Sequence, residues 1–108
     1  MIKLVAVLYL EDDEKVVEEL LEEAGIGTFS RFDMEGHGAG VPGWYGHVPT
    51  YRSRLLFTWV APEQAQALLS AVAGARGVQD TSHPIHALQI DVESMAHSGM
   101  PPVPPAQA

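Results

Sequence analysis

The chain has 108 residues, of which 46% are hydrophobic, so it holds enough apolar material for one compact core and little for a second. Six Lys and Arg against fourteen Asp and Glu give a net charge of −8, and we therefore expect no nucleic-acid partner. The lack of cysteine excludes disulfides, thiolate metal sites and a cysteine nucleophile.

The apolar start of the chain, residues 2–10, has neither the basic leader nor the small-residue cleavage site of a signal peptide, and acidic residues follow it directly. No stretch approaches the roughly 20 apolar residues of a membrane span. We therefore expect a cytoplasmic protein with no direct membrane insertion.

The first third of the chain predicts a strand, a helix and a second strand. Residues 2–10 are rich in Val and Leu on both faces, which is typical of a central strand. Residues 12–24 carry an apolar stripe at helical spacing, and Gly25 stands where a helix C-cap is expected. The acids at 11–14 fit the solvated first turn of that helix. Residues 28–35 alternate between polar and apolar and predict the second strand.

Residues 36–50 predict a long loop, because they hold five glycines and two prolines. A loop of this length inside a compact domain usually carries function or is disordered. Trp44 and Tyr45, within it, either pack on a neighbouring subunit or anchor a partner protein.

The second half of the chain predicts a strand at 51–60, a helix that begins at Pro62, and a fourth strand at 85–92. We expect one domain over residues 1–95 and a proline-rich, disordered tail over residues 96–108.

This order predicts an α+β fold, the ferredoxin-like βαββαβ sandwich, in which two helices cover one face of a four-stranded sheet. We expect the other face to be apolar and to need a cover, because leaving it wet costs on the order of several kcal/mol. Association with further copies of the chain is the simplest way to bury this face. The alternative is a monomer whose half-exposed face binds a ligand. The residues that we assign to this patch are Val5, Val7, Tyr9, Leu55, Phe57 and Trp59.

Short glycine motifs flank the second predicted strand. A Gly-Ile step at 25–26 precedes it, and Gly36-His37-Gly38 closes it. Together with the element order, these motifs resemble the PII nitrogen-regulator superfamily over residues 1–95. The resemblance implies a homotrimer with its sheets packed inward, and a mobile regulatory loop, the T-loop, that contacts a protein partner. Ser30 falls where that family has an adenine-contacting threonine, which implies an adenine nucleotide as ligand.

The chain departs from that family where nucleotide phosphates are bound. PII proteins use a Gly-Asp-Gly-Lys loop, but residues 77–83 here read GVQDTSH, and Arg76 is the basic residue nearby. Asp91 and Glu93 end the strand that follows, so we expect no triphosphate site of the usual kind. The residues that the resemblance assigns to cofactor binding are Ser30, Gly36, His37, Gly38 and Arg76.

The stretch GTFSRFDMEGHG, the strand YRSRLLFTWV and the closing VESM resemble a divergent PII-like branch found with heavy-metal efflux pumps. This resemblance implies metal-linked signalling and a membrane transporter as partner.

Imidazole suits Cu, Zn and Ni, and carboxylates complete such sites. The candidate metal ligands are His37, His47, Glu35, His83 and His86. The alternative is that these histidines are loop and surface residues that share no ion.

We therefore predict a PII-like signalling protein that binds a divalent metal or an adenine nucleotide and acts on a partner through the loop at 36–50, with no catalytic activity. The sequence holds no nucleophile-elbow motif and no isolated acid–base pair. Two alternatives stay open: a small ferredoxin-like enzyme of monooxygenase or lyase type with its site on the open sheet face, and a purely structural trimer.

Overall fold

The computed structural model describes residues 2–37 and 50–99. Residues 100–108, most of the predicted tail, lie outside this description. In chain order the elements are β1 (Lys3–Leu10), the 3-10 helix η1 (Glu11–Asp13), α1 (Glu14–Glu23), β2 (Ser30–His37), β3 (Thr50–Val60), α2 (Pro62–Ala73) and β4 (His86–Asp91).

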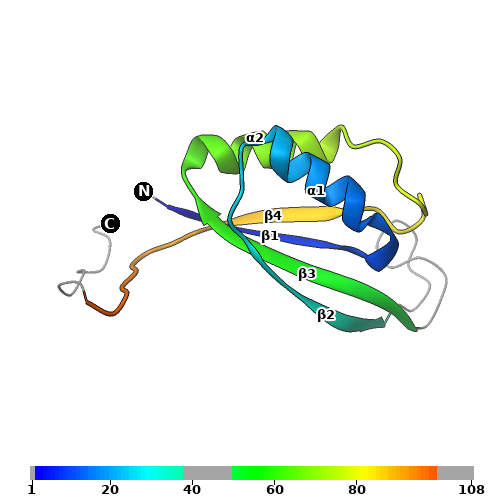
Figure 1. The fold of residues 1–108 in the computed structure, drawn as a ribbon, viewed down its shortest axis with the longest axis horizontal. Coiled ribbons are helices and arrows are strands. Elements are labelled where there is room, and N and C mark those ends of the chain that lie inside the picture. The colour runs from blue at the N-terminus through cyan, green and yellow to red at the C-terminus, as the bar shows by residue number, and fades with distance from the viewer. Residues whose placement is uncertain (1, 38–49, 100–108) are drawn as a thin grey trace.

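The four strands form one antiparallel sheet in the order β2-β3-β1-β4, and α1 and α2 lie together on one of its faces (Figure 1). This arrangement agrees with the predicted α+β class and is compatible with a ferredoxin-like fold. No helix in the described part of the chain is long and apolar enough to cross a membrane.

The predicted elements are all present, with shifted ends. The 3-10 turn comes first, so α1 proper begins at Glu14. β2 runs from Ser30 to His37, two residues into the predicted loop, and β3 already begins at Thr50. The other loop residues, 38–49, lie outside the described residues, and so do the predictions made for Gly38, Trp44, Tyr45 and His47.

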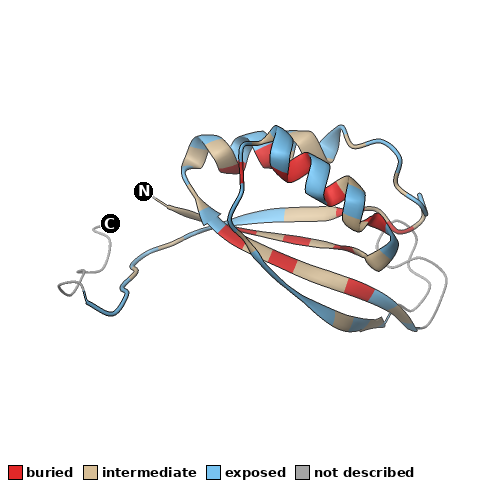
Figure 2. Ribbon diagram, in the orientation of Figure 1, coloured by how far each residue is buried: buried red, intermediate tan, exposed pale blue. Residues whose placement is uncertain are grey.

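The core lies between the sheet and the two helices, as the buried segments in Figure 2 show. β1 runs through its centre, and its alternate residues Val5, Val7 and Tyr9 are at most 1% exposed. At about 25 cal/mol per Å² of buried apolar area, this layer supplies the main stabilisation of the fold. Its members are Val5, Val7, Tyr9, Val17, Leu20, Leu21, Ile26, Leu56, Ala65, Leu68 and Ile85.

The sheet face opposite the helices is apolar, as predicted, but three of the six residues predicted to lie on it lie on the other face. Val5, Val7 and Tyr9 point toward the helices and are buried. Residues paired across antiparallel strands share a face, and Leu4 pairs with Trp59. The open face, as we call it below, carries Leu4, Ala6, Leu8, Phe32, Met34, Leu55, Phe57, Trp59, Leu88 and Ile90.

On the helix side of the sheet, β2 is attached to the domain by charged contacts, in addition to its backbone pairing with β3. Its helix side presents Arg31 and Asp33, and both join a network centred on Glu14 at the start of α1. The Glu14 carboxylate accepts hydrogen bonds from Arg31 Nη1 at 2.5 Å, Arg54 Nη1 at 2.8 Å and the Tyr9 hydroxyl at 2.8 Å. Arg54 Nε donates to Asp33 Oδ1 at 2.8 Å, which closes the network.

Candidate functional site

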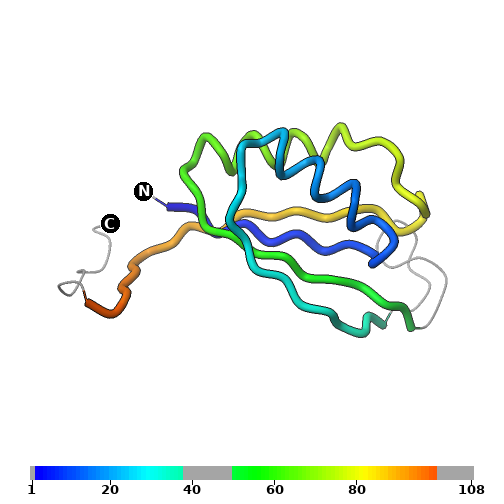
Figure 3. The backbone as a smooth tube through the Cα atoms, viewed as in Figure 1, coloured from blue at the N-terminus to red at the C-terminus, as the bar shows by residue number. Residues whose placement is uncertain are grey.

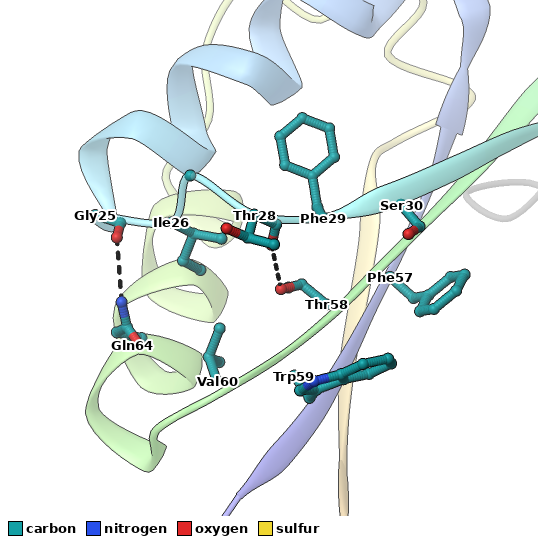
Figure 4. Close-up of a pocket in the computed structure, with 11 residues that line it drawn as sticks. Gly25, Ile26, Thr28, Phe29, Ser30, Phe57, Thr58, Trp59, Val60 and Gln64 are labelled. Carbon is teal, nitrogen blue, oxygen red and sulfur yellow. Dashed lines mark hydrogen bonds between the residues drawn. The ribbon is translucent and has the colours of Figure 1, made fainter. Parts of the chain in front are cut away.

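A pocket of about 330 Å³ opens where the chain passes from α1 to β2 over the end of β3 (Figure 4). Residues 25–30 form one wall, and residues 57–60 of β3 form the other. Gln64 of α2 lies at one end. Figure 3 shows this connection descending from the helix layer to the sheet beside β3. The pocket therefore lies at the rim shared by the helix layer and the open face.

The first wall begins at a Schellman cap of α1. Gly25 adopts φ 73°, the amide of Ile26 donates to the carbonyl of Leu21 at 2.9 Å, and the amide of Gly25 donates to the carbonyl of Glu22 at 3.0 Å. Ile26 then enters the core, with 6% of its surface exposed. The cap turns the chain toward β3 and sets the direction of the wall.

Replacing Gly25 by Ala is expected to lower the free energy of unfolding by about 1 kcal/mol, because an L residue at positive φ is strained although open space surrounds the new methyl group. Urea unfolding measures this loss. Gly27→Ala is the matched control, since Gly27 also has open space and no positive φ. An equal loss in both variants would contradict the role of the cap.

Side-chain hydrogen bonds hold the first wall in place. The Thr58 hydroxyl donates to the carbonyl of Thr28 at 2.6 Å, and Gln64 Nε2 donates to the carbonyl of Gly25 at 3.1 Å (Figure 4). Gln64 also accepts from the amide of Ala61 at 3.4 Å, at the start of α2. These contacts fix residues 25–28 against both β3 and α2, so the pocket is largely preformed.

The second wall is aromatic on one side and offers backbone polar groups on the other. The rings of Phe57 and Trp59 lie 6.0 Å apart between centroids, tilted by 36°. The ladder between β2 and β3 ends at the pair Ser30 and Phe57. Successive residues of an antiparallel strand direct their backbone groups to alternate sides, so at least one residue among 58–60 presents its amide and carbonyl to the pocket.

The residues predicted to bind a cofactor do not converge within one chain. Ser30 lines the pocket, and its role in binding adenine stays a prediction. Gly36 and His37 lie at the opposite end of β2, about 20 Å away at strand spacing. Arg76 follows α2 and borders a different surface hollow. Gly38 lies outside the described residues.

The predicted metal ligands form one close pair. His37 Nε2 lies 2.8 Å from Glu35 Oε2, on an exposed part of β2. His83 is 5% exposed, and burial lowers the pKa of His86 below its ordinary value. Residues 2–37 and 50–99 contain no group of three or more His, Asp or Glu that could hold an ion, and His47 lies outside these ranges. The metal site stays a prediction.

Gly36 has a local reason to be glycine. A β-carbon at this position would lie 2.0 Å from Cε2 of Tyr51, its partner across the ladder. The Tyr51 ring therefore lies directly over the Gly36 backbone. The sequence motif predicts a ligand-binding role for Gly36, whereas the structure shows this packing against Tyr51.

Most of the residues that line the pocket were not predicted from the sequence. Phe57 and Trp59 were expected only on the open face, and Thr28, Thr58 and Gln64 belong to no predicted site. One signal was present in the sequence, a threonine inside the otherwise apolar end of β3, where a hydroxyl needs a partner.

No family model matches the chain, and no curated protein shows detectable similarity to it. The PII-like resemblance therefore stays a proposal.

Proposed function

We propose that the protein is a non-catalytic regulatory subunit that binds a planar nitrogen heterocycle, such as the base of an adenine nucleotide, in the pocket between residues 25–30 and 57–60. The observation that carries the proposal is the combination in one pocket of an exposed aromatic wall with unpaired strand-edge backbone. A flat ring stacks on the first and exchanges hydrogen bonds with the second.

The chemistry of the lining favours binding over acid–base catalysis. Its eleven residues include three polar side chains with hydroxyls, those of Thr28, Ser30 and Thr58, and the amide of Gln64, but no acid, base or imidazole. Stacking on an aromatic side chain contributes about 1–3 kcal/mol per base, which suits a sensor that must release its ligand again.

The size and charge of the pocket limit the ligand. A volume of about 330 Å³ is small for a ligand site and accommodates a base with little else. Phosphates would extend outside, around a chain with a net charge of −8. We therefore expect adenosine or AMP to bind at least as well as ATP.

The open face supports association of copies in the same proposal. Phe32, Trp59, Leu88 and Ile90 are 41–53% exposed on this one face, a larger apolar patch than isolated surface residues produce. Trp59 belongs both to the patch and to the pocket, so a neighbouring copy on the open face would border the ligand. A homotrimer of the PII kind is the assembly that we propose.

The resemblance alone supports a protein partner. Residues 36–50 would contact this partner and signal to it, and the partner would be a membrane transporter if the protein is similar to the heavy-metal branch. A divalent cation at Glu35 and His37 is the rival ligand, supported by their 2.8 Å contact.

An enzyme with its site on the open face is less well supported. The hollow there has a volume of about 310 Å³, and its lining offers neither a general base nor a nucleophile. It is lined by Leu4, Phe57, Trp59, Val92, Met95 and Ala96.

Ligand titration tests the proposal. In a Trp44→Phe background Trp59 is the one remaining tryptophan, so its fluorescence is expected to change on addition of adenosine or AMP and to saturate. Calorimetry with AMP, ATP, Zn²⁺ and Cu²⁺ on the same protein ranks the ligands.

Ser30→Leu fills the pocket, and we expect it to weaken AMP binding at least about tenfold. Ser94→Leu, the same change at an exposed position after β4, is the matched control and should bind normally. The proposal fails if no adenine compound binds, or if Ser30→Leu binds AMP as tightly as the control does.

A further inference from the structure

The hollow on the open face lies where the chain leaves the sheet. β1 and β3 contribute three of its six lining residues, and the segment that follows β4 contributes the other three. The amide of Val92 donates to the carbonyl of Ile2 at 3.3 Å, which keeps the start of that segment beside β1. All six residues of the lining are apolar: Leu4, Phe57, Trp59, Val92, Met95 and Ala96.

Two aromatic rings in the hollow are only partly covered. Phe57 and Trp59 lie 6.0 Å apart between ring centroids, and 53% of Trp59 is exposed. Grooves lined by aromatic rings are surfaces on which proline-rich segments dock in a polyproline II conformation. Such a segment loses little conformational entropy on docking, because proline already restricts its backbone.

The chain carries a segment of this kind directly after the hollow. Residues 100–108 lie outside the described residues and read MPPVPPAQA, with four prolines. Residues 100–106 contain no polar side chain, so each of the three faces of a polyproline II helix formed by them is apolar. No Asp, Glu, Lys or Arg follows Glu93, so the segment adds no side-chain charge to a chain whose net charge is −8. Its chemistry therefore matches that of the hollow.

The segment begins within reach of the hollow. Figure 1 shows residues 92–99 extending beyond the end of the sheet, so the chain must turn back to bring later residues to the hollow. Ser98 and Gly99 form a turn, and the φ of 88° at Gly99 is a conformation that glycine adopts readily. Seven residues of polyproline II span about 22 Å, more than the roughly 10 Å from β4 across β1 to β3. The turn and this length suffice to bring residues 100–106 over Trp59.

We propose that residues 100–106 turn back in a polyproline II conformation and dock in this hollow, on Phe57 and Trp59 of the same chain. Met100 follows Ala96, a lining residue, by only four positions. Such a short connection gives an effective concentration on the order of mM, so weak affinity is enough for docking within one chain. Docking there leaves Phe32, which pairs with Leu55 four residues from Trp59 along β3, available to a neighbouring copy.

Acrylamide quenching of Trp59 fluorescence tests the docking without any added ligand. In a Trp44→Phe background Trp59 is the one remaining tryptophan. The docked segment covers part of its ring, so a chain that ends at Gly99 should be quenched at least about twofold more strongly than the full chain. A full-length chain with serine in place of the four prolines should behave as the truncated chain does, because it keeps the length but not the apolar faces.

Nuclear Overhauser contacts locate the segment directly. Val103 is the one valine among residues 100–108, and its methyl groups should contact the Trp59 indole in the full chain. Met95→Glu places a carboxylate in the lining of the hollow and should remove this contact. Ser94→Glu is the matched control, because it adds the same charge one residue earlier, at an exposed position outside the lining, and it should retain the contact.

Equal quenching of the full and truncated chains would overturn the proposal, and so would loss of the Val103 contact in both glutamate variants. A mixture of isotope-labelled and unlabelled chains separates contacts within one chain from contacts between chains. The contact between Val103 and Trp59 should be absent from the signals that join two chains. Its presence there would place the segment on a neighbouring copy and overturn docking within the chain.

Discussion

If copies associate through the open face as proposed, replacing Ile90 by Lys is expected to give monomers at concentrations where the wild type is associated. Ile90 is 51% exposed in the single chain and lies on the open face of β4. Burying its side chain between copies contributes about 2–3 kcal/mol, and an unpaired ammonium in the same interface costs several kcal/mol more. The dissociation constant should therefore rise at least about a hundredfold, as measured by analytical ultracentrifugation.

Gln89→Lys is the matched control for this experiment. Gln89 is the exposed neighbour of Ile90 on the same strand, and it pairs with Val5 and so belongs to the helix side of the sheet. The two variants carry the same new charge one residue apart. If the control dissociates as much as Ile90→Lys, or if the wild type is monomeric at every concentration tested, the open face is not an interface between copies.

The element order was predictable from the sequence because each element has its own period. The helical stripe of α1, the continuous apolar run of β1 and the alternation of β2 all carry their signal within a few residues. The polar and apolar residues of that alternation occupy opposite faces of β2, with Phe32 and Met34 on the open face and Arg31 and Asp33 on the helix side.

The faces of the central strand were not predictable in the same way. Both sides of β1 are apolar, so nothing in its sequence distinguishes the side of Val5 and Val7 from that of Leu4 and Ala6. The register with β3 decides the matter, and register depends on pairing between segments distant along the chain. The predicted patch therefore combined the residues of β3 that do lie on the open face with the residues of β1 that face the helices.

The candidate sites were also only partly predictable, because they depend on contacts between segments distant along the chain. Ser30 was proposed through a resemblance, but Thr58 and Trp59 line the same pocket only because β3 lies beside residues 25–30. The acids at 11–14 were interpreted as a solvated helix start, which is wrong for Asp13 and Glu14. Asp13 is fully buried, and the Glu14 side chain is 17% exposed. A run of acids looks solvated until the partners of each carboxylate are known.

Among the charged side chains that attach β2 to the domain, removal of the Glu14 carboxylate is expected to lower the free energy of unfolding most. Glu14→Ala deprives the buried hydroxyl of Tyr9 of its acceptor and leaves Arg31 and Arg54 without their shared partner. Burial and the nearby carboxylate raise the pKa of Tyr9 far above its ordinary value, so the hydroxyl stays a donor at every working pH. An unsatisfied buried hydroxyl costs about 1–3 kcal/mol, and we expect the free energy of unfolding to fall by about 2 kcal/mol.

Because alanine is the best helix former, this loss cannot come from the helix propensity of α1. Glu18→Ala is the matched control, since its carboxylate lies 3.9 Å from Arg31 and is 52% exposed, and its loss should stay within about 0.5 kcal/mol. Hydrogen exchange should show the damage concentrated in β2, an edge strand that pairs only with β3 in the described sheet. Equal losses in the two variants would mean that apolar packing, and not this carboxylate, holds β2 to the domain.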